Sequence, residues 1–138
     1  MNFDTVILHC SATNSEQDFD AATIDRWHKA NGWKGCGYHF VIKRDGTVER
    51  GRDITERGAH AKGYNDTIGV CYIGGCDLSG RPEDNMTVQQ VTAFKQLVNK
   101  LRDIFGEVRV IGHNDLPGVR KACPSFKVSD KFGSWCNG

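Results

Sequence analysis

The segment "TIGVCYIGG", residues 67–75, decides the fold of this chain of 138 residues. It is a continuous apolar run that two glycines close. A strand with one face in water alternates between polar and apolar residues, whereas a strand covered on both faces has an unbroken apolar run. The segment therefore predicts the central strand of a sheet with other elements packed on both of its faces.

Two further strands are predicted, one on each side of this segment along the chain. Residues 5–10, "TVILHC", form a short β-branched and apolar run that ends near His9. Residues 108–113, "VRVIGH", form the last strand and end at His113. Short runs of this composition are typical of buried strands. Each strand thus delivers a histidine at its downstream end.

Residues 37–51, "GYHFVIKRDGTVERG", predict a β-hairpin. Two alternating runs flank Asp45 and Gly46, and these residue types tolerate the positive φ of a tight turn. Successive side chains of a strand point to opposite faces, so Tyr38 and His39 are expected on opposite sides of the sheet.

A short amphipathic helix is predicted in "DAATIDRWHKANG", residues 20–32. Ile24, Trp27 and His28 have helical spacing, Asp20 is a suitable N-cap, and Gly32 is a stop signal. His28 lies beside Trp27 on the apolar stripe, which favours a structural role for this histidine.

A longer helix is predicted in "MTVQQVTAFKQLVNKLRDIFG", residues 86–106. Thr87 and Gln90 form a capping box at its start, and Gly106 ends it. Its apolar stripe is expected to comprise Val91, Phe94, Leu97, Val98, Leu101, Ile104 and Phe105.

The elements therefore follow the order strand, helix, hairpin, strand, helix, strand, with no internal repeat, low-complexity tract or linker. Residues 1–138 are predicted to form a single α/β domain, a central mixed β-sheet flanked by helices. Ligands of such folds bind beyond the carboxyl ends of the strands. His9 and His113 both lie there.

The composition argues against two classes of partner. Lys and Arg number 18 against 17 Asp and Glu, a net charge of +1, so no nucleic acid is expected, because phosphate binding needs a basic excess. No apolar segment approaches the ~20 residues of a membrane helix. The N-terminal segment lacks the basic leader and cleavage site of a signal peptide. We expect a monomeric cytoplasmic protein without a membrane partner.

The six cysteines are expected to be mostly reduced in such a compartment, although their even number also permits disulfides. Cys71, within the apolar run, is expected in the core. No role follows for Cys10, Cys36, Cys76 and Cys136.

The segment "IGHNDLPGVRKACPSF", residues 111–126, places Cys123 ten residues after His113. A metal site is one interpretation of this pair, although the spacing alone is a weak signal and does not match that of structural zinc modules. Catalytic zinc takes three protein ligands and leaves the fourth position to water. His9, His113 and Cys123 would supply this set, with two ligands on strand ends and one on a loop that Pro117 and Pro124 restrict. Bound to Zn²⁺, water becomes a nucleophile at neutral pH, which suits hydrolysis of an amide.

Amide hydrolysis also needs a group that stabilises the oxyanion and a group that protonates the leaving amine. Lys121 and Tyr38 are the candidates for these catalytic roles. His39 alternates with Tyr38 and should face away from this site. Two other interpretations of Cys123 stay open at this level: a small buried hydrophobe, or the nucleophile of a cysteine hydrolase with a His base.

Several motifs follow one another in order from about residue 4 to residue 126: "VILHCSAT", "WHKANGWKGCGYHFVIKRDGTVERGRD", "GAHAKGYNDTIGVCYIGG" and "KACPSF". Together they resemble the motifs of the type 2 N-acetylmuramoyl-L-alanine amidases. This family of zinc amidases includes short phage lysozymes, and the animal peptidoglycan recognition proteins share its fold.

The resemblance implies zinc ligation by His9, His113 and Cys123, and catalytic roles for Tyr38 and Lys121. It implies cleavage of the amide between the lactyl group of N-acetylmuramic acid and L-alanine, with peptidoglycan or a muropeptide as the substrate. The segment "GAHAKGYN" resembles a loop that lines the substrate groove, which implies substrate contacts from His60 and Asn65. A phage or prophage endolysin is expected, one that acts on the cell wall after its release from the cytoplasm.

One departure from the family pattern lies beside the second ligand. Asn114 and Asp115 replace a His and a Glu of the phage lysozymes, so Asp115 is an alternative ligand or a partner that orients His113. Two alternatives to an endolysin stay open: a bacterial enzyme that recycles muropeptides by the same chemistry, and a non-catalytic muropeptide-binding module. Binders of this fold typically lack the Cys ligand, which this chain has.

Overall fold

The computed structural model describes all residues from Met1 to Gly138. Its main elements, in chain order, are β1 (Thr5–Cys10), α1 (Ala21–Ala30), β2 (Phe40–Ile42), β3 (Val48–Arg50), β4 (Ile68–Tyr72), α2 (Val88–Phe105), β5 (Arg109–Gly112) and α3 (Val128–Phe132). Two 3₁₀ turns, η1 (His113–Asp115) and η2 (Gly133–Asn137), follow β5 and α3. The predicted order of strands and helices is confirmed.

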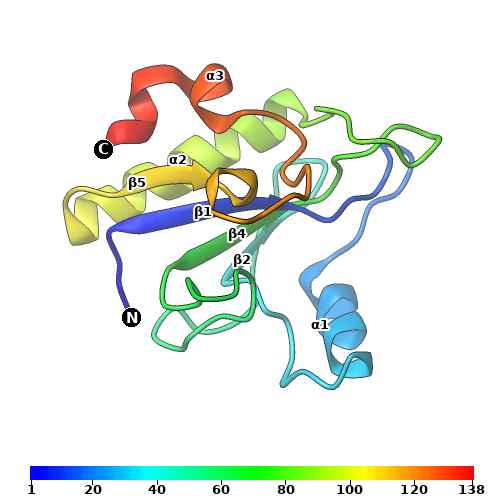
Figure 1. Cartoon of the computed structure of the whole chain (residues 1–138), viewed down its shortest axis with the longest axis horizontal. Helices are drawn as coiled ribbons and strands as arrows, with labels where there is room; N and C mark the ends of the chain where they lie inside the picture. Colours follow the sequence, from blue (N-terminus) through cyan, green and yellow to red (C-terminus); the bar gives the residue numbers. More distant parts are fainter.

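The strands form one mixed sheet with the order β3-β2-β4-β1-β5 (Figure 1). The predicted central strand is β4, which pairs in parallel with β2 on one side and with β1 on the other. β1 also pairs in parallel with β5, and β2 pairs with β3 as the predicted antiparallel hairpin. Of the two turn residues, Gly46 alone has a positive φ, of 91°. The parallel pairing brings the carboxyl ends of β1, β4 and β5 to the same edge of the sheet.

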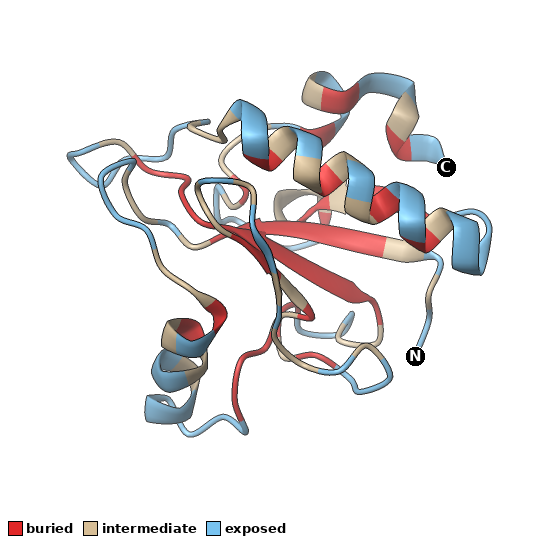
Figure 2. Cartoon of the chain, turned by 180° about the vertical axis from the view of Figure 1, so that it is seen from behind, coloured by how far each residue is buried: buried red, intermediate tan, exposed pale blue.

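One face of the sheet packs against α2 and the C-terminal segment. Alternate residues of β1 and β4, among them Val6, Leu8, Val70 and Tyr72, join Phe94 of α2 in a single apolar cluster. Figure 2 shows this layering: the strands are buried along most of their length, whereas α2 is buried only along the side that faces the sheet. The capping box of Thr87 and Gln90 begins α2 as predicted.

The other face of the sheet is covered by loops instead of a long helix. Ile7 of β1 packs there against Ala61 and Leu116, which come from the loops that precede β4 and follow β5. The helix α1, at whose start the Asp20 carboxylate accepts a hydrogen bond from the amide of Thr23, lies at the edge of this face (Figure 1). Because His9 alternates with Leu8 along β1, its side chain shares the loop-covered face with Ile7.

The structure differs from the sequence-based expectation at the C-terminal end of the chain. Ile104 is 70% exposed, so the apolar stripe of α2 ends earlier than predicted, although Phe105 stacks on Phe3 with ring centroids 4.4 Å apart. The unpredicted α3 and η2 pack on α2: Phe132 contacts Phe94, and Arg102 donates hydrogen bonds to the carbonyls of Val108 and Trp135. No helix of the chain combines the length and apolarity required to cross a membrane.

Candidate metal centre

Three potential metal ligands converge at the edge of the sheet where the parallel strands end. His9 comes from β1, His113 begins the turn after β5, and Cys123 lies on the following loop. One ligand atom from each of them lies within 4.8 Å of the ligand atoms of the other two. His9 is buried, and the other two residues are half-buried. The structure thus brings together the three residues that the sequence singles out.

The His9 ring is fixed by a third histidine. Nε2 of His9 lies 2.9 Å from Nδ1 of His60, and Nε2 of His60 donates a hydrogen bond to the backbone oxygen of Thr67 at 3.0 Å. The two rings meet edge to face, with centroids 5.0 Å apart. His113, whose ring centroid is 4.5 Å from that of His9, is hydrogen-bonded to no protein group through its ring.

The Cys123 loop is tied to the sheet by several hydrogen bonds. The Tyr72 hydroxyl, at the end of β4, donates to the backbone oxygen of Pro124 at 2.6 Å. The Ser125 hydroxyl donates to the backbone oxygen of Gly75 at 2.7 Å, and the amide of Cys10 donates to Sγ of Cys123 at 3.2 Å. Ser125 has a φ of 75°, which residues with a side chain seldom adopt. These bonds hold the loop in an unusual conformation that directs the sulfur to the histidines.

Burial and nearby positive charge favour neutral imidazoles at this centre. Desolvation lowers the pKa of His9 well below its ordinary value, and His60, His113 and Lys121 lower it further. The pKa of His113 is lowered by burial and then by Lys121. A metal needs the unprotonated form of imidazole, so both histidines are in the state that can bind a cation.

The thiol of Cys123 is protonated without a cation. Its hydrogen bond with the Cys10 thiol raises the pKa of Cys123, and burial raises it further. A cation in this centre would replace that proton, because the thiolate is the form that ligates metals.

Tyr38 lies beside the three ligands. Its ring centroid is 5.1 Å from that of His9, and desolvation raises its pKa well above the ordinary value of a phenol. The hydroxyl therefore stays protonated and can donate a hydrogen bond. Tyr38 also contacts the ring of His28, whose Nδ1 accepts a hydrogen bond from the amide of Gly37 at 2.8 Å. His28 thus has the structural role that the sequence predicts.

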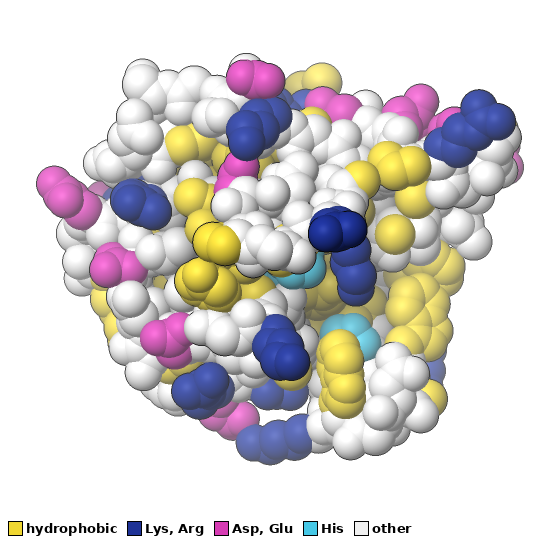
Figure 3. Space-filling view, in the orientation of Figure 1, with side chains coloured by type: hydrophobic (Ala, Val, Ile, Leu, Met, Phe, Trp, Pro, Cys, Tyr) yellow, Lys and Arg dark blue, Asp and Glu magenta, His cyan; other side chains and the backbone are white.

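A groove of about 700 Å³ extends from the centre between the loop before β4 and the loop after β5. Figure 3 looks onto this face, where His side chains lie in a hollow bordered by Lys and Arg. The lining residues include no acid, and they are Trp33, Ala59, His60, Ala61, Lys62, Tyr64, Asn65, His113, Leu116, Pro117, Gly118, Val119, Arg120 and Lys121. The groove therefore suits a ligand with carboxylate groups.

The sequence of the chain matches a known protein family. Residues 1–126 match the family described as N-acetylmuramoyl-L-alanine amidase. The chain belongs to this family. The match contains all three potential metal ligands, Tyr38 and Lys121, so the predicted family resemblance is confirmed.

Relatives and solved structures agree with the assignment. The chain is 48% identical to the endolysin of Enterobacteria phage K11 over 122 residues, which are 88% of this chain and 80% of that endolysin. It is 47% identical to the endolysin of Escherichia phage T7 over 127 residues, which are 91% and 82% of the two chains. Among solved structures, the N-acetylmuramoyl-L-alanine amidase LysC from Clostridium intestinale URNW has a TM-score of 0.78 at 29% identity, over 93% of this chain and 80% of that one. The same α/β fold is thus found in a solved amidase.

Within this amidase fold, Asp115 is not directed to the metal centre. One carboxylate oxygen accepts a hydrogen bond from the amide of Gly112 at 2.8 Å, and the other pairs with Lys127 at 2.8 Å. Asp115 therefore fixes the turn on which His113 lies. Of its two predicted roles, the structure excludes that of an alternative metal ligand.

Two residues of the predicted groove loop are used inside the protein. The Asn65 side-chain oxygen accepts hydrogen bonds from the amides of His60 and Ala61 at 2.8 and 2.9 Å. Both ring nitrogens of His60 also have protein partners. Each residue lines the groove, but the side-chain oxygen of Asn65 and the His60 ring nitrogens already have partners, which leaves their predicted substrate contacts as a hypothesis.

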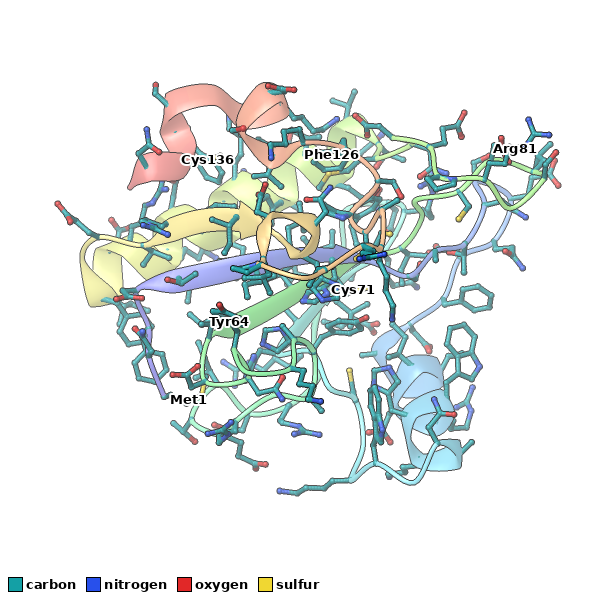
Figure 4. The ribbon with its side chains drawn as sticks, in the orientation of Figure 1. Met1, Tyr64, Cys71, Arg81, Phe126 and Cys136 are labelled. Carbon is teal, nitrogen blue, oxygen red and sulfur yellow. The ribbon has the colours of Figure 1, made fainter.

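The remaining histidine and cysteines lie outside the ligand group. His39 is fully buried, accepts a hydrogen bond from the amide of Gly69 through Nδ1 and approaches the Glu56 carbonyl through Nε2. Cys71 is fully buried in the core as predicted, and all six cysteines are free thiols. Figure 4 shows Cys71 at the centre of the molecule and Tyr64 on the loop beneath β4, on the other side of the sheet from Phe126 and Cys136.

The sequence did not single out Tyr72, which anchors the Cys123 loop. We expect Tyr72→Phe to weaken zinc binding and to lower the free energy of unfolding by about 1–3 kcal/mol, because the buried Pro124 carbonyl loses its hydrogen-bond donor. Zinc affinity is measured by competition with a chelator, and stability by urea unfolding. Tyr64→Phe, at a 38% exposed tyrosine, is the matched stability control. Equal stability of the two variants would contradict the anchoring role of Tyr72.

Proposed function

We propose that this protein is a zinc-dependent N-acetylmuramoyl-L-alanine amidase that degrades peptidoglycan. It hydrolyses the amide between the lactyl group of N-acetylmuramic acid and the L-alanine of the stem peptide. The observation that supports the proposal most strongly is the convergence of His9, His113 and Cys123 within 4.8 Å in a chain of this family.

The donor set fits zinc. Two imidazole nitrogens and one thiolate are ligands that zinc prefers, and three protein ligands leave one position open, as in catalytic zinc sites. Structural zinc sites use four protein ligands, and Asp115, the alternative ligand that the sequence suggests, is engaged by Lys127. When bound, zinc supplies an activated water and polarises the scissile carbonyl.

Tyr38 and Lys121 would assist the reaction from the protein side. The protonated hydroxyl of Tyr38 can donate a hydrogen bond to the oxygen on which negative charge develops. Lys121 lines the groove and is exposed, so its positive charge can stabilise the same oxygen. The leaving amine requires a proton, and either group can give it.

The groove would hold the glycopeptide. Lys62, Arg120 and Lys121 place positive charge along it, and no acid opposes them. Stem peptides of peptidoglycan have carboxylates along their length, so the charge of the groove favours a bound strand of the wall or a soluble muropeptide. Trp33 and Tyr64 add apolar surface to the same groove.

The similarity to phage endolysins supports a role in lysis. In this setting the protein would remain monomeric in the host cytoplasm until the membrane is opened, and would then reach the wall. An endolysin cleaves intact sacculi, whereas a recycling amidase acts on soluble muropeptides, so cleavage of both substrates by the purified protein would favour the endolysin.

The first test combines metal content with product analysis. The purified protein is expected to contain one zinc ion per chain and to release free N-terminal alanine from peptidoglycan. Chelation should abolish this release, and added zinc should restore it. Cys123→Ser should lose the zinc, whereas Cys76→Ser, at a cysteine outside the ligand group, should keep it. Full activity of metal-free protein that alkylation destroys would instead identify a cysteine hydrolase.

The second test separates catalysis from binding. Tyr38→Phe and Lys121→Ala should each lower kcat by about 10²–10³-fold, the usual effect of losing an oxyanion donor, with little change in zinc content. Lys100→Ala, on the exposed side of α2, is the matched control for Lys121→Ala. A parent protein that holds zinc and binds muropeptide without turnover would show that the chain is a binding module.

A further inference from the structure

His60 is a buried histidine to which the proposed chemistry gives no direct part. It lies on the loop before β4, is 9% exposed, and uses both ring nitrogens inside the protein. Nδ1 lies 2.9 Å from Nε2 of His9, and Nε2 lies 3.0 Å from the backbone oxygen of Thr67. The three groups form a chain that runs from the backbone through His60 to His9.

The Thr67 carbonyl determines the direction of both hydrogen bonds in this series, from Thr67 to His60 and from His60 to His9. A backbone carbonyl only accepts, so Nε2 of His60 must bear the proton that it donates to Thr67. A neutral imidazole has a single N–H, so Nδ1 of His60 has a lone pair and accepts. The His60 ring is buried, and its two nitrogens face His9 and the Thr67 carbonyl, so no carboxylate is there to balance the charge of a second proton. The proton between the two rings therefore belongs to Nε2 of His9.

This assignment leaves Nδ1 of His9 without a proton. Nε2 of His9 is occupied by His60, so Nδ1 is the nitrogen available to the group formed with His113 and Cys123. A free imidazole in water exchanges between its two tautomers, and only one of them presents a lone pair at Nδ1. The backbone carbonyl of Thr67 thus selects the tautomer of His9 through the His60 ring.

The surrounding residues leave space for the His60 ring and hold it in place. A Cβ atom on Gly69, in the middle of β4, would lie 2.6 Å from Cγ and Cδ2 of His60. A Cβ atom on Gly58 would lie 2.5 Å from Cδ2. The Asn65 side chain accepts hydrogen bonds from the amides of His60 and Ala61 and fixes the loop. The glycine in the central strand is therefore explained by the ring that it accommodates.

We propose that His60 is a positioning residue that holds His9 in the Nε2–H tautomer and so turns Nδ1 of His9 toward the metal. The proposal rests on the proposed function for the identity of the ion, but it makes a statement about the metal-free protein that can be tested separately. His60 itself contacts neither the ion nor the reacting bond in this role.

The direct test is the tautomer of His9 in the metal-free parent protein. Ring nitrogen NMR, with long-range correlations from the ring protons, distinguishes a protonated from an unprotonated nitrogen. We expect a protonated Nε2 and an unprotonated Nδ1 in His9, and the same tautomer in His60. A proton on Nδ1 of His9 at neutral pH would overturn the proposal, whatever the activity of the protein.

The second test is zinc affinity in two variants of His60. His60→Ala removes the acceptor and should weaken zinc binding by about 10–100-fold, the usual effect of losing such a partner of a metal ligand. His60→Asn can place an amide oxygen near the position of Nδ1, so it should restore much of the affinity and the Nε2–H tautomer of His9.

The control is Gln90→Ala. Gln90 is also fully buried and donates hydrogen bonds to the backbone oxygens of Ile42 and Ile73, but it belongs to α2, on the opposite face of the sheet from His60. Gln90→Ala should lower the melting temperature and leave zinc affinity unchanged. Equal zinc affinity of His60→Ala and the parent would contradict the proposal. A parent that binds zinc with the expected tautomer but releases no alanine would contradict the proposed function and leave the positioning role intact.

Discussion

Parallel pairing of β1 with β4 and β5 is the constraint on which the rest of the structure depends. It places the carboxyl ends of three strands at one edge of the sheet, so His9, Tyr72 and His113 lie near one another although they are far apart in the chain. The histidines belong to rigid or short elements, which limits the freedom that a bound ion would have to remove. Only Cys123 comes from a loop, and hydrogen bonds from Tyr72, Ser125 and Cys10 restrict the movement of this loop.

One face of the sheet contains most of the apolar core, and the other face contains the candidate metal centre and the groove. The face under α2 contains the main apolar cluster, centred on residues such as Phe94 and Tyr72. The opposite face is covered by loops, and a groove of about 700 Å³ opens there. Tyr72 links the two faces, since its ring lies in the core and its hydroxyl holds the Cys123 loop. The packing of Tyr72 under α2 therefore helps to fix the position of Cys123 relative to the two histidine ligands.

Local patterns in the sequence were sufficient to predict most of the fold. The unbroken apolar run predicted β4, the capping box at Thr87 predicted the start of α2, and the placement of His9 and His113 at strand ends predicted their convergence. The exposure of Ile104 was missed because helical periodicity does not show where a sheet ends. The short helix α3 was missed because its packing on α2, and not its own pattern, stabilises it.

The internal contacts of the centre were beyond prediction from sequence. The bond between His9 and His60 depends on the path of an irregular loop, and the only local signal was a glycine at position 69 inside an otherwise bulky strand. Asp115 resembled a ligand because acidic groups near histidines often are. Its engagement by Lys127 depends on how the last loop folds back.

X-ray absorption spectroscopy of the zinc-loaded protein tests the central claim most directly. The account predicts one sulfur at about 2.3 Å from zinc and two imidazole nitrogens at about 2.0–2.1 Å, with a light atom in the remaining position. Zinc surrounded only by nitrogen and oxygen, or an ion that does not bind at all because Cys123 is in a disulfide, would contradict it.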